Sequence, residues 1–196
     1  MSSQFFTFIQ ATLIAVITAM VGALQAEDAT SGWEQLENQN YAEALSQFQN
    51  EVETDLKPKA LSRAQYGLGL SAYQTRDYEL AARAFGEALI GSPQSAKQAA
   101  HYNLGNTLYR KGQILTNTSQ SSGELTQKQV DQTIEQWESA IDHYEASLAL
   151  PSIKQMASDN IDVVKKSIED LKKQLEDQQQ QQNQDQQQQQ NQDQQQ

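Results

Sequence analysis

The 196-residue chain contains no cysteine, only three prolines and only two histidines. The lack of cysteine excludes a disulfide framework, a thiolate zinc site and a redox pair of cysteines. Basic residues are also scarce, because 14 Lys and Arg stand against 25 Asp and Glu, a formal net charge of −11. Nucleic acid needs a basic footprint, so this balance argues against it as a partner. With no nucleophile–base arrangement, phosphate loop or dinucleotide fingerprint either, the sequence predicts a non-enzymatic protein without cofactor or metal.

Charged side chains are absent from residues 1–26. The apolar run Ala11–Leu24, followed by a small residue and two acids, is typical of a cleaved secretory signal peptide. Counted from Phe5, however, the stretch is 20 residues long and could cross a ~30 Å hydrocarbon layer as a retained anchor. No Lys or Arg precedes the run, which weakens the signal-peptide interpretation, so both alternatives stay open. Either one predicts an exported protein, in the periplasm or on the periplasmic face of the cell membrane.

The other end of the chain is polar throughout. Of the 19 residues 178–196, 15 are Gln and the others are Asn or Asp. A segment without apolar side chains cannot bury a core, so its composition predicts a disordered Gln-rich tail. Between the two ends, residues 27–177 are enough for one domain with its own core.

Two patterns repeat within this domain. The pattern Y-x-L-G-x-x-x-Y begins at Tyr66 and again at Tyr102, 36 residues later. The pattern A-x-x-x-[FY] begins at Ala44, Ala81 and Ala140, with offsets of 37 and 59 residues. Self-similarity at such a period indicates an array of helical hairpins. The surplus of 23 residues in the last offset predicts an insertion, rich in Ser, Thr and Gln, over 114–136.

Side-chain sizes fit a hairpin array. Gly69 and Gly105, with Ala81 and Ala140 opposite, allow paired helices to approach closely. The bulky residues expected to fill the space between adjacent hairpins are Phe48, Phe85 and Tyr144. A proline follows each A-x-x-x-[FY] helix, and its missing donor and its ring are expected to end that helix. These prolines are Pro58, Pro93 and Pro151.

The segment 62–93 closely resembles a tetratricopeptide repeat (TPR). The motif residues it carries are Leu68, Gly69, Tyr78, Ala81, Phe85, Ala88 and Pro93. The resemblance implies an all-α helical-hairpin solenoid of about three repeats, at about 29–58, 60–93 and 96–151, followed by a capping helix at 152–177. An apolar stripe supports that cap: Ile161, Val164, Ile168, Leu171 and Leu175. A short coiled coil with a partner is the alternative use of the stripe.

In TPR stacks the first helix of each pair lines a concave groove. Carried over, the resemblance implies a partner-binding groove made of Arg63, Tyr66, Leu70, Tyr73, Gln74, Tyr102, Asn103, Asn106, Tyr109 and Arg110. Aromatic area, amides and guanidinium groups suit an extended peptide. The alternative is that some of these tyrosines pack between hairpins. His101 and His143, with no neighbouring histidine expected, are interpreted as structural or surface residues.

Charge is unevenly distributed along the chain. Residues 27–56 carry a net charge of −8, residues 57–111 carry +5 and residues 112–196 carry −8. The basic stretch coincides with the expected groove, which predicts a protein partner presenting an acidic or extended segment.

The combination of an exported TPR domain, the motif A-x-x-N-I-x-x-V-K-K at 157–166 and a Gln-rich tail is similar to the TPR subunits of bacterial Bat (aerotolerance) operons. This resemblance implies a scaffold or adaptor that binds protein partners, accompanying von Willebrand-type membrane proteins and a MoxR-type ATPase in envelope stress tolerance. The alternative function is a membrane-tethered structural spacer, with the N-terminal segment retained as anchor.

Overall fold

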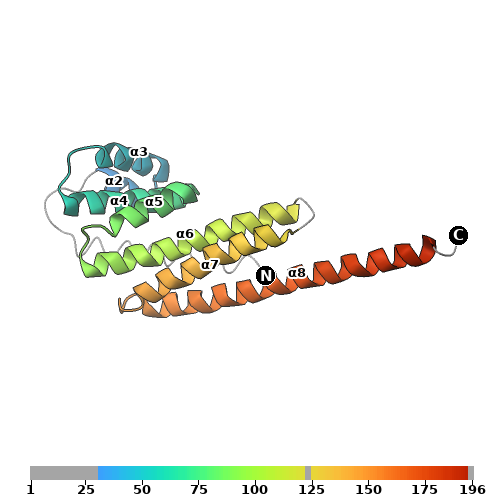
Figure 1. Cartoon of the computed structure of the whole chain (residues 1–196). Helices are drawn as coiled ribbons and strands as arrows, with labels where there is room; N and C mark the ends of the chain where they lie inside the picture. Colours follow the sequence, from blue (N-terminus) through green and yellow to red (C-terminus); the bar gives the residue numbers. More distant parts are fainter. Residues whose placement is uncertain (1–30, 122–124, 194–196) are drawn as a thin grey trace.

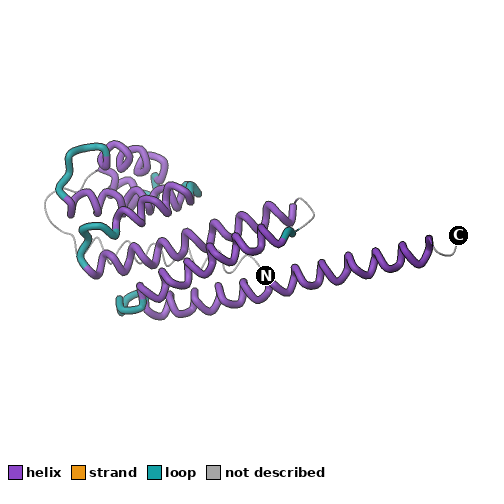
Figure 2. The backbone as a smooth tube through the Cα atoms, in the orientation of Figure 1, coloured by secondary structure: helices purple, strands orange, loops and turns teal. Residues whose placement is uncertain are grey.

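A computed structural model describes residues 31–121 and 125–193 of the chain. The described residues are helical apart from short connections, and no strand occurs among them (Figures 1 and 2). The predicted leader or anchor over 1–26 lies outside these residues. Within them, no helix is both long and apolar enough to cross a membrane.

The described residues form seven helices that stack in chain order. They are α2 (Ser31–Glu37), α3 (Tyr41–Val52), α4 (Pro58–Gln74), α5 (Tyr78–Ala88), α6 (Gln94–Ser121), α7 (Gln127–Ser147) and α8 (Lys154–Asp193). Hairpins form between α2 and α3, α4 and α5, and α6 and α7, and α8 packs on α7. Contacts of α3 with α4 and of α5 with α6 join the hairpins. Figure 1 shows α2–α5 on one side of α6 and α8 along α7. The chain is therefore an all-α helical solenoid, as the repeats predicted.

Local sequence explains where these helices begin. The Asp77 side chain accepts a hydrogen bond from Leu80 N at 3.0 Å and so caps α5. Thr126 and Gln129 form a reciprocal capping box at the start of α7. Pro58, expected to end α3, instead occupies the first turn of α4, six residues after Val52, the last residue of α3. A proline suits that position because the first helical N–H groups have no partner within the helix.

Glycine-to-aromatic contacts hold the hairpins together. A Cβ atom added at Gly69 would lie 2.6 Å from the ring of Phe85, and one at Gly67 would lie 2.4 Å from the ring of Phe48. Gly105 faces Tyr144 in the same way, at 2.9 Å. The aromatic rings are fully buried. This confirms the predicted close approach at Gly69 and Gly105, and it adds Gly67 as the contact of Phe48 with the next hairpin.

The 114–136 insertion lengthens two helices. α6 continues to Ser121 and α7 begins at Gln127, so the two helices have 28 and 21 residues, against 17 and 11 in α4 and α5. Trp137 anchors the extension: its ring covers Gly112, and its Nε1–H donates to the Tyr109 carbonyl oxygen at 3.1 Å. Much of the stretch expected as an insertion within the helix pair is thus continuous helix on both sides of its loop.

The last helix caps the stack over its first half. The side chains of Ile161, Val164, Leu171 and Leu175 are buried in the common core, as the apolar stripe predicted. Gln178 marks the end of the packed part, since its Oε1 accepts from Leu125 N at 3.3 Å. Beyond this point α8 continues through the Gln-rich segment to Asp193. Glutamine has good intrinsic helix propensity, and a helix already nucleated by packing propagates at little cost.

Candidate partner-binding surface

The structure separates the ten predicted groove residues into two groups. Seven are buried by neighbouring helices: Tyr66, Leu70, Tyr73, Tyr102, Asn103, Asn106 and Tyr109. None of the seven is more than 9% exposed, so they are not available to a partner in this structure. The partner-binding role predicted for them is therefore corrected to packing between hairpins. The remaining three, Arg63, Gln74 and Arg110, are half-buried and reach solvent.

Buried hydrogen bonds join several polar groups of the first set to neighbouring helices. Asn103 Nδ2, on α6, donates to the Tyr66 hydroxyl on α4 at 2.7 Å. Asn106 Oδ1 accepts from the Tyr144 hydroxyl at 2.8 Å and from Asn160 Nδ2, on α8, at 3.1 Å. Buried polar groups need such partners, and here the partners come from neighbouring helices. The amides and phenols that suit peptide binding are used to fix the stacking of α4, α6, α7 and α8.

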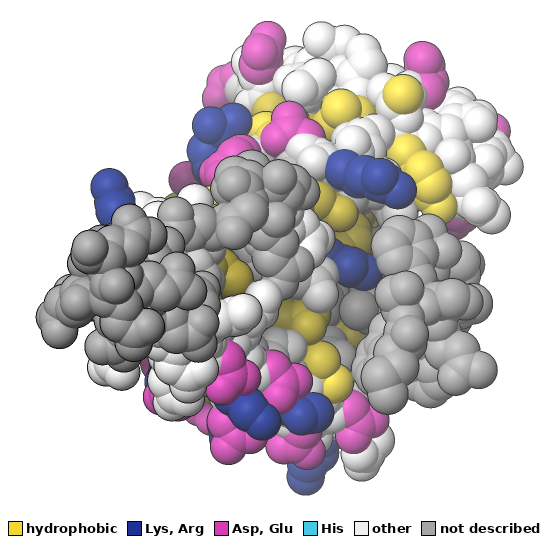
Figure 3. All heavy atoms as spheres, turned by 90° about the vertical axis from the view of Figure 1, so that its right-hand side faces the viewer, with side chains coloured by type: hydrophobic (Ala, Val, Ile, Leu, Met, Phe, Trp, Pro, Cys, Tyr) yellow, Lys and Arg dark blue, Asp and Glu magenta, His cyan; other side chains and the backbone are white. Residues whose placement is uncertain are grey.

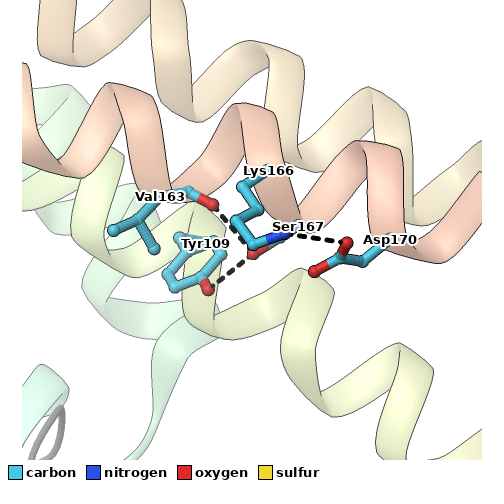
Figure 4. A network of polar contacts seen from close by, with 5 residues as sticks. All are labelled: Tyr109, Val163, Lys166, Ser167 and Asp170. Carbon is cyan, nitrogen blue, oxygen red and sulfur yellow. Dashed lines mark hydrogen bonds and ion pairs between the residues drawn. The ribbon is translucent and has the colours of Figure 1, made fainter.

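Tyr109 extends the same pattern to α8 (Figure 4). Its hydroxyl lies 3.1 Å from the Oγ atom of Ser167, which itself donates to the Val163 carbonyl oxygen at 2.9 Å. A serine hydroxyl has one hydrogen, so Tyr109 is the donor of the pair. Figure 4 also shows Lys166 and Asp170 paired at 3.1 Å on α8.

Burial changes the acidity of three of these phenols. It raises the pKa of Tyr66 well above its ordinary value, although the hydrogen bond from Asn103 partly opposes this. Burial also raises the pKa values of Tyr144 and Tyr73, the latter against the opposing charge of Arg110. All three therefore stay protonated at neutral pH, and they act only as neutral hydrogen-bonding and packing groups.

Two cationic groups of the predicted groove, Arg63 and Arg110, reach solvent on the first helices α4 and α6. The Arg63 guanidinium carbon lies 5.3 Å from the centroid of the Trp33 ring, a cation–π contact that holds the side chain against α2. Arg110 Nη1 donates to Gln113 Oε1 at 2.9 Å. Burial lowers the pKa of Arg110, but the phenols of Tyr73 and its neighbours outweigh that effect and raise it, so the guanidinium keeps its charge.

Sequence reasoning missed several neighbours of Arg110. The ring of Tyr78 packs edge-on against Tyr73, with centroids 5.4 Å apart. Lys111 Nζ pairs with Glu79 Oε2 at 2.9 Å and links α6 to α5. These residues lie outside the first-helix positions to which the family pattern pointed. The Y-x-L-G-x-x-x-Y pattern puts Tyr73 on the first helix of its pair, α4, but nothing in the spacing indicates which second-helix residues it contacts.

The sequence suggested that the two histidines are isolated, but the structure brings them together. His101 on α6 and His143 on α7 lie with their Nδ1 atoms 2.9 Å apart. Both are half-buried, and desolvation lowers the pKa of each. The nearby Lys97 charge lowers the pKa of His101 further, whereas Asp142 acts against the lowering at His143. The expectation that no other histidine lies nearby is wrong, because the lengthened offset between α6 and α7 concealed that these positions face each other.

The exposed face beside the hairpin ends is mixed in character. Figure 3, which looks along the molecule from the side where α8 ends, shows hydrophobic side chains and Lys or Arg side chains in the recess between α2–α5 and α6–α8. Ile114 and Leu115, on the extension of α6, are 49% and 37% exposed. No group of three or more His, Asp and Glu residues in the described part of the chain is placed to hold a metal ion. The surface thus combines cationic and apolar groups, which suits a polypeptide.

Comparison with known families agrees with the fold. A family model described as tetratricopeptide repeat matches residues 30–97 and, in a second overlapping match, residues 66–114. The matches run from α2 into α6 and stop where the extension of α6 begins. No curated protein and no solved structure matches the chain. The repeat match supports a TPR protein, and repeats of this kind generally mediate protein–protein interaction and scaffolding, typically without catalysis.

Proposed function

We propose that this TPR protein is an exported scaffold that binds an acidic, extended segment of its partners at the face formed by α4 and α6. Its place would be a Bat-type envelope stress-tolerance complex in the periplasm, with von Willebrand-type membrane proteins among the partners. The supporting observation is that Arg63, Gln74 and Arg110 remain partly accessible to solvent, whereas every other predicted groove residue is buried.

Charge supports this choice of partner. The stretch 57–111 carries a net charge of +5 between two segments of −8 each. A carboxylate approaching α4 and α6 therefore meets guanidinium groups of fixed charge, and Arg binds carboxylates through two parallel hydrogen bonds. The neighbouring Tyr78 ring offers apolar area to the rest of the segment.

The test is binding of a synthetic Asp/Glu-rich peptide, and of the purified von Willebrand-type domain, to the full chain. Arg63→Glu/Arg110→Glu should weaken binding at least tenfold, whereas Arg83→Glu, a matched charge reversal at an exposed position of α5, should leave it unchanged. Affinity should also fall steeply between low and physiological salt. Equal losses of affinity in both variants would indicate a non-specific charge effect and would refute binding at the face formed by α4 and α6.

A structural spacer remains the second candidate function. It is favoured by α8, whose 40 residues span roughly 60 Å and continue beyond the other helices (Figure 1). Alkaline carbonate extraction distinguishes the two functions, because a spacer that keeps residues 1–26 as anchor stays in the membrane fraction. Release into the supernatant, with an N-terminus near Glu27, would support the exported scaffold.

A further inference from the structure

The pair of histidines between α6 and α7 has no role in the surface described above. His101 Nδ1 and His143 Nδ1 are 2.9 Å apart, whereas the ring centroids are 5.1 Å apart, so the rings face each other through these nitrogens. Two imidazoles in this arrangement share one hydrogen atom: one Nδ1 carries it and the other accepts it. At least one lone pair is therefore directed into the space between the rings.

We propose that His101 and His143 form a transition-metal site of two imidazole ligands, with Cu²⁺ the preferred ion, in which the metal takes the place of the shared hydrogen. Imidazole nitrogen is a ligand for Cu, Ni and Zn, and among divalent ions such a site favours Cu²⁺.

Distances make the site feasible. With metal–nitrogen bonds of ~2.0 Å, two ligands separated by a right angle lie roughly 2.9 Å apart, and two opposite ligands lie about 4 Å apart. The observed nitrogen separation is at the short end of this range. The rings only have to turn about their side-chain bonds until both lone pairs meet at the ion. Both side chains are half-buried, so water can reach a bound ion and complete the coordination.

The surroundings contain one group that helps the ion and one that opposes it. Asp142, exposed next to His143, supplies negative charge, and Lys97, one helical turn before His101, supplies positive charge. The two ligands come from different helices, so a bound ion would also tie α6 to α7.

The experiment titrates CuCl₂ into the full chain, purified without a histidine tag, by isothermal calorimetry. One equivalent should bind, His101→Gln or His143→Gln should each weaken binding at least tenfold, and Cu²⁺ should raise the Tm of the wild type alone. Asp142→Asn should weaken binding and Lys97→Gln should strengthen it. An unchanged isotherm in the double His101→Gln/His143→Gln variant would overturn the proposal.

A second measurement needs no variant. Bound Cu²⁺ is paramagnetic, so one equivalent should broaden the imidazole proton resonances of both histidines in the wild-type NMR spectrum, and Zn²⁺ should shift them instead. Sharp, unshifted histidine signals at one equivalent of Cu²⁺ would overturn the site even if the variants failed to fold.

Discussion

Replacing Gly69 or Gly86 by alanine, within the hairpin of α4 and α5, should change the stability of the protein in opposite directions. A Cβ atom at Gly69 would lie 2.6, 2.7 and 2.9 Å from three ring atoms of Phe85, whereas one at Gly86 would meet nothing within 4 Å. Replacing glycine by alanine inside a helix stabilises it by ~1 kcal/mol through backbone entropy alone. Gly86→Ala, near the end of α5, should therefore stabilise the protein by about 0.5–1 kcal/mol.

At Gly69 the stabilisation by alanine is offset by steric overlap with the Phe85 ring. The Phe85 ring is fully buried and has the Tyr66 ring at 5.7 Å, so it cannot retreat without displacing a second aromatic side chain. Overpacking of this kind costs roughly 1–3 kcal/mol. Gly69→Ala should then destabilise the protein by up to about 2 kcal/mol, which separates the two variants by up to roughly 3 kcal/mol.

Thermal unfolding followed by circular dichroism measures this difference. For a chain of this size, 1 kcal/mol shifts Tm by about 2–4 °C, so the two variants should move in opposite directions from the wild type. Adding Phe85→Leu should remove the clash, and a double-mutant cycle should then show coupling between the two sites. If Gly69→Ala raised Tm as much as Gly86→Ala does, the close contact between α4 and α5 would be refuted.

Three further predictions concern the buried hydrogen bonds and the last helix. Tyr144→Phe should lower the free energy of unfolding in urea by only ~1 kcal/mol, because Asn106 keeps its bond from Asn160; a loss above 3 kcal/mol would contradict this. Above pH 10 the unfolded phenols ionise while buried Tyr66 and Tyr144 hold their protons, so stability should fall as pH rises, and their phenolate absorbance should appear only on unfolding. A chain ending at Gln178 should unfold at the wild-type temperature, whereas one ending at Asn160 should unfold far lower because it lacks the apolar stripe of α8.

Packing positions were predictable from the sequence because few residue types satisfy them. Gly69 and Gly105 lie under aromatic rings, and Ala81 and Ala140 are fully buried, since any larger side chain would separate the helices. The length of the hairpin extension was less predictable. The Ser-, Thr- and Gln-rich composition of 114–136 indicates an insertion but not whether it is ordered, and the buried Val130 and Trp137 supply the apolar contacts that keep α7 helical.

The groove was harder to predict because tyrosine and asparagine serve two environments equally well. Both can present themselves to a peptide, and both can be buried if a partner group is within reach. Here α8 supplies that partner group through Asn160 and Ser167, at sequence separations of more than 50 residues that no local pattern encodes.

Arginine does not have this freedom, because burying its charge without a paired anion costs far more than burying an amide. Arg63 and Arg110 therefore remain at the surface, while the uncharged residues beside them are sealed between helices. Among the predicted groove residues, these two charged side chains therefore stay within reach of a partner in this structure. It follows that substitution of Tyr102 or Asn106 would reduce partner binding only by loosening the fold, with a matching fall in Tm, whereas Arg110→Glu should reduce binding at constant Tm. Loss of partner binding by Asn106→Ala at an unchanged Tm would show that the buried residues also contribute to binding. It would refute the assignment of binding to the arginines alone.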